Sequence, residues 1–224
     1  MSDTKERYEY LCQFISESRK EKFERNVLER TRYITLVVED IYQAHNASAV
    51  LRSVECMGIQ DVHVIENRNK YTPNPDVVMG ADKWLNIHRY NGHENNTIAC
   101  IRELKKLGYR IVATTPHTKD CLIEDLPIES GKIALVFGTE IDGISDLVKQ
   151  EADEFVKIPM VGFTESYNIS VSAAICLYEL TKRMKKSNVA WRLSEQEQEQ
   201  LKLDWVRASV QRPDLLEKEF EEKQ

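Results

Sequence analysis

The chain has 224 residues, of which 42% are hydrophobic and 30% charged, and its formal net charge is −6. This length supports one substantial hydrophobic core with short terminal additions, as in an ordinary soluble globular protein. No run of about 18 uninterrupted apolar residues occurs, and the first ten residues (MSDTKERYEY) contain no apolar signal segment, so we expect neither a membrane span nor a secreted protein.

Apolar runs and helical periodicity alternate along the chain. The runs predict strands at residues 33–38, 61–66, 85–90, 109–114, 133–137 and 154–158. The periodicity predicts helices at residues 5–24, 46–57, 96–107, 145–152, 169–185 and 194–222, the last broken before Pro213. The polar segment 67–83 is predicted to be a loop with one helical turn. Short strands alternating with helices indicate an α/β fold, with a mainly parallel sheet flanked by helices.

The distribution of charge and cysteine is more informative than the net charge. Five basic and no acidic residues lie between Lys182 and Arg192, whereas nine acidic and five basic residues follow from Ser194 onward. A solvated helix surface and an RNA-binding surface explain the basic segment 182–192 equally well. The five cysteines form no CxxC pair, so we expect reduced thiols in a cytoplasmic protein and no metal site.

The segment HNASAVLRS (45–53) opens the second predicted helix. Asn46 suits the N-cap position, and Gly58 is expected to stop the helix after Met57. Arg52 points away from the apolar side of the helix wheel. An isolated arginine at such a position is most often simply solvated.

The segment FGTEIDGIS (137–145) directly follows a predicted strand. Gly138 and Gly143 bracket Glu140, which indicates a tight backbone turn that could approach a ligand closely. An ordinary strand-to-helix turn explains the segment equally well. The chain has no GxGxxG fingerprint, which argues against a dinucleotide-binding dehydrogenase.

The segment IPMVGFTESYNISVSAA (158–174) runs from the end of a strand into a helix rich in small residues. Ser166 or Asn168 could cap that helix. The small residues allow close backbone packing, either in the core or against another subunit.

Together the three segments resemble the TrmH branch of the SPOUT methyltransferases. The resemblance extends from about residue 30 to residue 183, and the three motifs occur in the family's order. They are Asn46 with Arg52, then Gly138-x-Glu140-x-x-Gly143, and then Ile158-Pro159-Met160 with Ser166-x-Asn168-x-Ser170. Each motif alone is weak evidence, but their joint order and spacing are specific.

The resemblance implies a fold, a cofactor and a partner. Family members bind S-adenosyl-L-methionine (SAM) in a deep C-terminal trefoil knot, which would occupy about residues 110–186 here. The residues that would contact the cofactor are Thr114, Gly138, Ile158 and Tyr167, the last in place of a common leucine. Members are homodimers that pack through the helix beginning near Asn168. The implied domain boundaries are an N-terminal helical RNA-binding extension at 1–30, a methyltransferase domain at 31–186 and a C-terminal helical tail at 187–224.

The implied reaction is methyl transfer from SAM to a ribose 2′-hydroxyl of RNA, with a guanosine in the tRNA D-loop as the expected target. The resemblance gives Arg52 the central role, either as the base for the hydroxyl proton or as a bidentate phosphate ligand that aligns the hydroxyl. The other residues implied in catalysis are Asn46, Glu140, Ser166 and Asn168. The residues expected to contact tRNA phosphates are Arg19, Arg25, Arg30 and Arg32.

Two alternatives remain open from the sequence. One is a 2′-O-methyltransferase for ribosomal RNA or another tRNA position, although such relatives often have a separate N-terminal RNA-binding domain. The other is a non-catalytic RNA-binding or assembly protein with the same fold, which would not need the complete set of motif residues.

Overall fold

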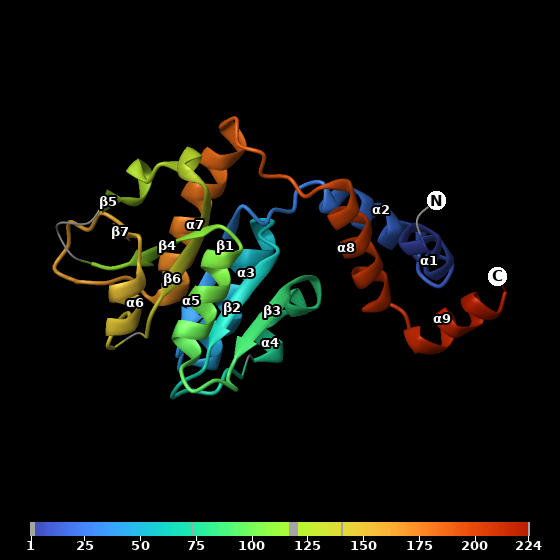
Figure 1. Cartoon of the computed structure of the whole chain (residues 1–224), viewed down its shortest axis with the longest axis horizontal. Coiled ribbons are helices and arrows are strands. Elements are labelled where there is room, and N and C mark those ends of the chain that lie inside the picture. The colour runs from blue at the N-terminus through green and yellow to red at the C-terminus, as the bar shows by residue number, and fades with distance from the viewer. Residues whose placement is uncertain (1–2, 73, 117–120, 140, 224) are drawn as a thin grey trace. The chain divides into compact units, whose positions relative to one another are not determined.

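The computed structural model describes residues 3–72, 74–116, 121–139 and 141–223. The chain forms two compact units (Figure 1). The smaller unit combines residues 1–31 with residues 192–224, and the larger unit comprises residues 32–191. No helix among the described residues is long and apolar enough to cross a membrane.

A seven-stranded, fully parallel sheet forms the centre of the larger unit. Its strands are β1 (Ile34–Glu39), β2 (Asp61–Ile65), β3 (Asn86–Tyr90), β4 (Tyr109–Thr114), β5 (Cys121–Leu122), β6 (Lys132–Phe137) and β7 (Glu154–Lys157). Their order across the sheet is β3-β2-β1-β6-β4-β7-β5. The expected α/β fold and six expected strands are thus confirmed, whereas β5, with two residues, was not predicted.

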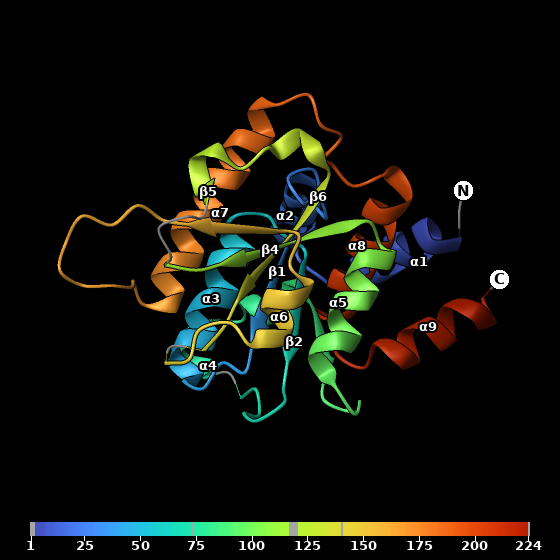
Figure 2. The same cartoon turned by 60° about the vertical axis from the view of Figure 1, so that its left-hand side comes forward.

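Helices cover both faces of this sheet (Figures 1 and 2). On one face lie α3 (Ala44–Cys56) and α7 (Ile169–Lys186), and on the other lie α5 (Asn96–Lys106) and α6 (Asp146–Glu151). The loop after β2 contains the short helix α4 (Pro75–Val78), as predicted. Short 3-10 turns lie at Ala81–Trp84, Ile123–Asp125 and Ile128–Ser130.

The central strand shows why its sequence is apolar throughout. Leu36 and Val38 pack toward α3 and α7, whereas Val37 packs toward α5. Leu36 pairs with Val62 of β2 and with Leu135 of β6. A parallel strand covered on both faces buries every side chain, so the alternation that marks a half-exposed strand is missing.

The smaller unit is helical and contains α1 (Asp3–Cys12), α2 (Glu17–Val27), α8 (Glu195–Arg207) and α9 (Pro213–Glu222). The single helix predicted at 5–24 is wrong, because Ser16 begins a new helix by accepting a hydrogen bond from the Arg19 backbone nitrogen at 3.3 Å. The break before Pro213 is confirmed. Tyr8, Phe23 and Trp205 are buried in this unit.

All five cysteines are free thiols, and Cys12, Cys100 and Cys176 are buried. The deep knot and the functional boundaries at residues 30 and 187 stay predictions.

Candidate functional site

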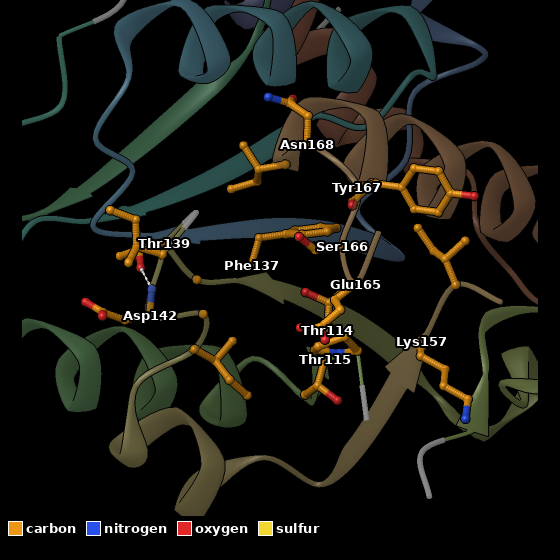
Figure 3. A pocket seen from close by; sticks show the side chains of 18 of the residues that line it. Thr114, Thr115, Phe137, Thr139, Asp142, Lys157, Glu165, Ser166, Tyr167 and Asn168 are labelled. Atoms are coloured by element: carbon orange, nitrogen blue, oxygen red, sulfur yellow. Dashed lines mark hydrogen bonds between the residues drawn. The ribbon is translucent and has the colours of Figure 1, made fainter. Parts of the chain in front are cut away.

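A cavity of about 580 Å³ lies at the carboxyl ends of β4, β6 and β7. The segments that follow these strands contribute Thr114–Pro116, Phe137–Thr139 with Ile141–Ile144, and a third group between Val156 and Ser172. Ligands of parallel α/β sheets bind at this edge, near the position where the strand order reverses. Figure 3 shows Thr114, Phe137, Ser166 and Asn168 around one space, with Thr139 and Asp142 at one side.

The loop after β6 is held in a narrow turn, called here the glycine loop (138–144). The backbone nitrogen of Thr139 donates to the Gly143 oxygen at 2.9 Å, and the Gly143 nitrogen donates back to Thr139 at 3.2 Å. The Thr139 hydroxyl also accepts from the Asp142 nitrogen at 2.9 Å (Figure 3). A Cβ atom at position 138 would lie 2.0 Å from the Gly143 oxygen, so only glycine fits there.

Two asparagines from distant segments meet beside the cavity. Asn168 caps α7, since its Oδ1 accepts from the Ser170 backbone nitrogen at 2.9 Å and from the Ser170 hydroxyl at 2.6 Å. The Asn168 Nδ2 donates to Asn46 Oδ1 at 3.1 Å, and Asn46 Nδ2 donates to Gln43 Oε1 at 3.1 Å. The first and third motifs are therefore joined by a direct side-chain contact.

Asn46 is not the N-cap that the sequence indicated. The helix α3 begins at Ala44 with Gln43 as its cap residue, so Asn46 lies within the first turn and is buried. This placement frees the Asn46 side chain from capping and directs it toward Asn168.

Seven of the residues predicted for the site line the same cavity. They are Asn46, Thr114, Gly138, Ile158, Ser166, Tyr167 and Asn168. Glu140 lies outside the described residues. The sequence did not indicate the charged residues of the lining, which include Asp142, Lys157 and Glu165.

Arg52 does not line the cavity. It lies on the same helix as Asn46, more than one turn further along, and its side chain is exposed. Its Nη1 donates to the Val77 backbone oxygen of α4 at 3.3 Å. The guanidinium is thus presented to solvent, close to the loop that follows β2.

The four N-terminal arginines have different environments. Arg19 and Arg25 are exposed on α2. Arg30 is only 3% exposed, and its guanidinium lies over the Trp205 ring at 5.2 Å. Arg32, in the larger unit, donates from Nε to Asp61 Oδ2 at 2.8 Å. Arg30 therefore packs inside its unit instead of facing solvent. Of the four arginines, only Arg19 and Arg25 are exposed to solvent.

Two buried acidic residues beside the site were missed by the sequence analysis. Glu39 ends β1 and Asp40 follows it, with exposed fractions of 3% and 6%. Their partners are more than 25 positions away in the chain. The available signal was the pair of acids at the end of an apolar strand, because a buried carboxylate needs hydrogen-bond donors.

Comparisons with known proteins agree with this geometry. The model of the SpoU rRNA Methylase family matches residues 33–178. The chain is 44% identical, over 96% of both chains, to the tRNA (guanosine(18)-2'-O)-methyltransferase of Borreliella burgdorferi. It is 27% identical to the enzyme of the same name from Thermus thermophilus, over 86% of this chain and 97% of that protein.

Among solved structures, the TrmH/SpoU tRNA modifying enzyme of A. aeolicus matches with a TM-score of 0.75 and 26% identity. This match covers 87% of the present chain and 100% of the other. The SpoU methyltransferase AviRb from Streptomyces viridochromogenes, in complex with AdoMet, shares the fold with a TM-score of 0.61 and 21% identity, over 73% of this chain and 65% of that one. The chain therefore belongs to the SpoU rRNA methylase family.

Proposed function

We propose that this protein transfers the methyl group of SAM to the ribose 2′-hydroxyl of guanosine 18 in tRNA. The observation that carries the target is the 44% identity, over 96% of the chain, to an enzyme of that name. The reaction class has independent support, because polar residues of the first and third motifs meet at one cavity.

The cavity residues fit SAM as the methyl donor. A volume of about 580 Å³ lies in the range typical of small-molecule sites. Phe137, Ile144 and Ile158 provide apolar surface for a purine ring, and the Asp142 and Glu165 carboxylates suit the cationic groups of SAM. The residues that would hold the cofactor are Thr114, Gly138, Ile158 and Tyr167. When bound, SAM supplies an electrophilic methyl group.

The role of Arg52 is on the RNA side of the reaction. A 2′-hydroxyl is a weak nucleophile, so its proton must be accepted near the transition state. Arg52 can accept that proton only as a neutral guanidine, because a guanidinium has donors and no acceptor. As a guanidinium it instead binds a phosphate bidentately and aligns the hydroxyl with the methyl group. Its exposure and its place outside the cavity lining favour a contact with RNA over one with the cofactor.

The remaining motif residues position these groups. Asn168 and Asn46 fix the start of α7 relative to α3, and Ser166 forms part of the cavity wall. Glu140 lies outside the described residues and, from its motif alone, stays our candidate for holding the segment between Gly138 and Gly143. We further propose that Arg19 and Arg25 bind tRNA phosphates, since both are exposed on one helix.

We also propose a cytoplasmic homodimer that packs through α7 and the loop before it. Large apolar side chains are exposed there, with Phe163 fully exposed, Tyr178 56% exposed and Val171 44% exposed. A cluster of exposed apolar side chains is typical of a protein interface. Sedimentation of the wild type and of Tyr178→Glu tests this, with a dimer expected for the first and a shift toward monomer for the second.

The experiment that tests the function is transfer of labelled methyl from SAM to unmodified tRNA transcripts, followed by mapping of the modified nucleotide. We expect 2′-O-methylguanosine at position 18, the position in the relative's name. Label that enters only ribosomal RNA would keep the chemistry and reject the target. No transfer to any RNA by folded, SAM-bound protein would favour a non-catalytic RNA-binding role.

A further inference from the structure

Glu39 connects the central strand to the end of the glycine loop. Its Oε1 accepts from the Thr97 hydroxyl at 2.7 Å and from the Ser145 hydroxyl at 2.8 Å, and its Oε2 accepts from the Ser145 backbone nitrogen at 3.0 Å. Ser145 directly follows the glycine loop and caps α6 by accepting from the Val148 nitrogen at 3.2 Å. The carboxylate therefore fixes the position at which the loop ends.

Asp40 performs a similar task for the loop that follows β2. Its Oδ1 accepts from three successive backbone nitrogens, those of Asn67, Arg68 and Asn69, at 2.7, 2.7 and 3.2 Å. Asp40 itself has a φ of +52°, a left-handed conformation that residues other than glycine seldom adopt. Such a backbone persists only where its surroundings favour it, and here the three hydrogen bonds do so.

The two loops are also joined to each other. Asn67 Nδ2 donates to the Thr97 hydroxyl at 2.9 Å, which links the Asp40 contacts to the Glu39 contacts. Arg68 Nη1 lies 3.4 Å from Asp142 Oδ2, and Asp142 lines the cavity. This last ion pair is highly exposed on both sides, so it is weak by itself and depends on the loops being held in place.

We propose that Glu39 and Asp40 are positioning residues that hold the glycine loop and the 67–69 loop in the arrangement that binds SAM. The identity of the ligand, SAM, rests on the proposed function. The loop contacts that Glu39 and Asp40 make are those of the protein without ligand. Both carboxylates act through other residues: Glu39 through Ser145, and Asp40 through the backbone of 67–69 and the Arg68 side chain. Preorganised loops bind a ligand without first having to be ordered.

The distribution of the hydrogen bonds determines which substitutions are informative. Glu39→Gln leaves one oxygen and one amide nitrogen, so at least one donor among Thr97 and Ser145 loses its acceptor in either orientation. Asp40→Ala removes all three loop contacts, whereas Asp40→Asn retains the single oxygen that accepts them and tolerates the left-handed backbone. Ser194→Ala is the matched control, because it removes a helix cap that does not line the cavity.

The test combines hydrogen exchange of the ligand-free chain with SAM titration by calorimetry. For Glu39→Gln and Asp40→Ala we expect amide exchange in 138–148 or 66–70, respectively, to accelerate roughly tenfold or more, and Kd and KM for SAM to rise about tenfold. The kcat at saturating SAM should change less than about twofold, since the chemical groups remain. Asp40→Asn should restore most of the protection, and Ser194→Ala should change neither segment.

The possible results distinguish a failure of the positioning role from a failure of the proposed function. Unchanged exchange in both loops for Glu39→Gln would overturn the positioning role, even if Asp40→Ala failed to fold. Faster exchange with unchanged SAM affinity would overturn it as well. Wild-type protein that binds no SAM would reject the proposed function alone, because the exchange measurement tests the loops without ligand.

Discussion

Two groups of buried polar residues in the larger unit perform different tasks. At the carboxyl end of β1, Glu39 and Asp40 accept hydrogen bonds from loop backbone and from hydroxyl groups. The second group, called here the Asp61 group, consists of Arg32, of Asp61 and His63 on β2, and of His88 on β3. Asp61 accepts from Arg32 at 2.8 Å and contacts His88 at 3.0 Å. His63 stacks on His88 with ring centroids 4.6 Å apart.

The difference lies in what each carboxylate contacts. A carboxylate that accepts from loop backbone determines the shape of that loop, and at this end the glycine loop, which Glu39 holds through Ser145, lines the cavity. Asp61 instead accepts from side chains, among them Asn86 of the neighbouring strand β3, and therefore stabilises the sheet. Strands β2 and β3 lie at the edge of the sheet that is farthest from β4, β6 and β7, the strands that end at the cavity. Substitutions at the carboxyl end should therefore alter methyl transfer, and substitutions in the Asp61 group should alter stability.

The largest expected effect is that of Arg52→Lys, which we expect to lower kcat roughly 100-fold or more. Lysine cannot reproduce the planar fork that aligns a phosphate or hydroxyl, and small misalignments cost about this factor. Single-turnover rates at saturating SAM and tRNA measure it, with Arg102→Lys on α5 as the control exposed arginine. Near-wild-type turnover would remove Arg52 from the mechanism.

Next, Asn168→Ala should reduce kcat/KM about tenfold and the free energy of unfolding by about 1 kcal/mol. It removes both the bond to Asn46 and the cap of α7, and the loss of a cap alone costs about this free energy. Asn95→Ala removes the cap of α5 and is the control for stability. If the two variants lost equal stability and activity, the Asn46–Asn168 contact would have no part in function.

The Asp61 group predicts a pH dependence of stability without an effect on catalysis. Burial, which is the largest cause, and the neighbouring His88 together lower the pKa of His63 from 6.5 to about 4, although Asp61 opposes this shift. The unfolded chain binds the proton near pH 6.5, so it holds more protons than the native state between pH 6.5 and 4. Stability is therefore complete above pH 6.5 and should fall by about 3 kcal/mol as the pH approaches 4.

His63→Phe should flatten this part of the stability curve, measured by urea unfolding between pH 7.5 and 4, because it removes the titrating ring. The exposed His93→Gln is the control and should retain the wild-type slope. Methyl transfer by His63→Phe at pH 7.5 should match the wild type. A large loss of transfer in a folded variant would contradict the separation of the two regions.

The smallest effect is expected for Arg25→Gln on α2. Loss of one phosphate contact should weaken tRNA binding and make the slope of log K against log salt shallower by about 1. Lys218→Gln, on the acidic helix α9, removes the same charge and should leave the slope unchanged. Equal slopes for wild type and Arg25→Gln would remove Arg25 from the RNA-binding surface.

Local patterns predicted most of the fold. Strands such as Lys132–Phe137 are apolar runs bounded by turn residues, and α7 follows a clear helical periodicity. The break between α1 and α2 could have been predicted from Ser16, a preferred cap residue followed by an acid. The two-residue strand Cys121–Leu122 has no detectable pattern, because it is defined only by its pairing with β7.

The site was predicted only as far as its motifs extend. Asn46 and Asn168 were selected by resemblance, but their contact joins residues 122 positions apart and leaves no local pattern. The contact between Glu39 and Ser145 spans 106 positions and lies outside the motif residues. The burial of Arg30 under Trp205 was hidden for the same reason, since the ring belongs to the opposite end of the chain.

The central claim is that the cavity at the carboxyl ends of the strands delivers a methyl group to one ribose hydroxyl. The most direct measurement uses two tRNAs that differ in a single atom, one with guanosine and one with 2′-deoxyguanosine at position 18. We expect labelled methyl from SAM to enter the first RNA and not the second, although both bind. Transfer to the deoxy substrate at an undiminished rate would place the methyl group on another atom and contradict the account.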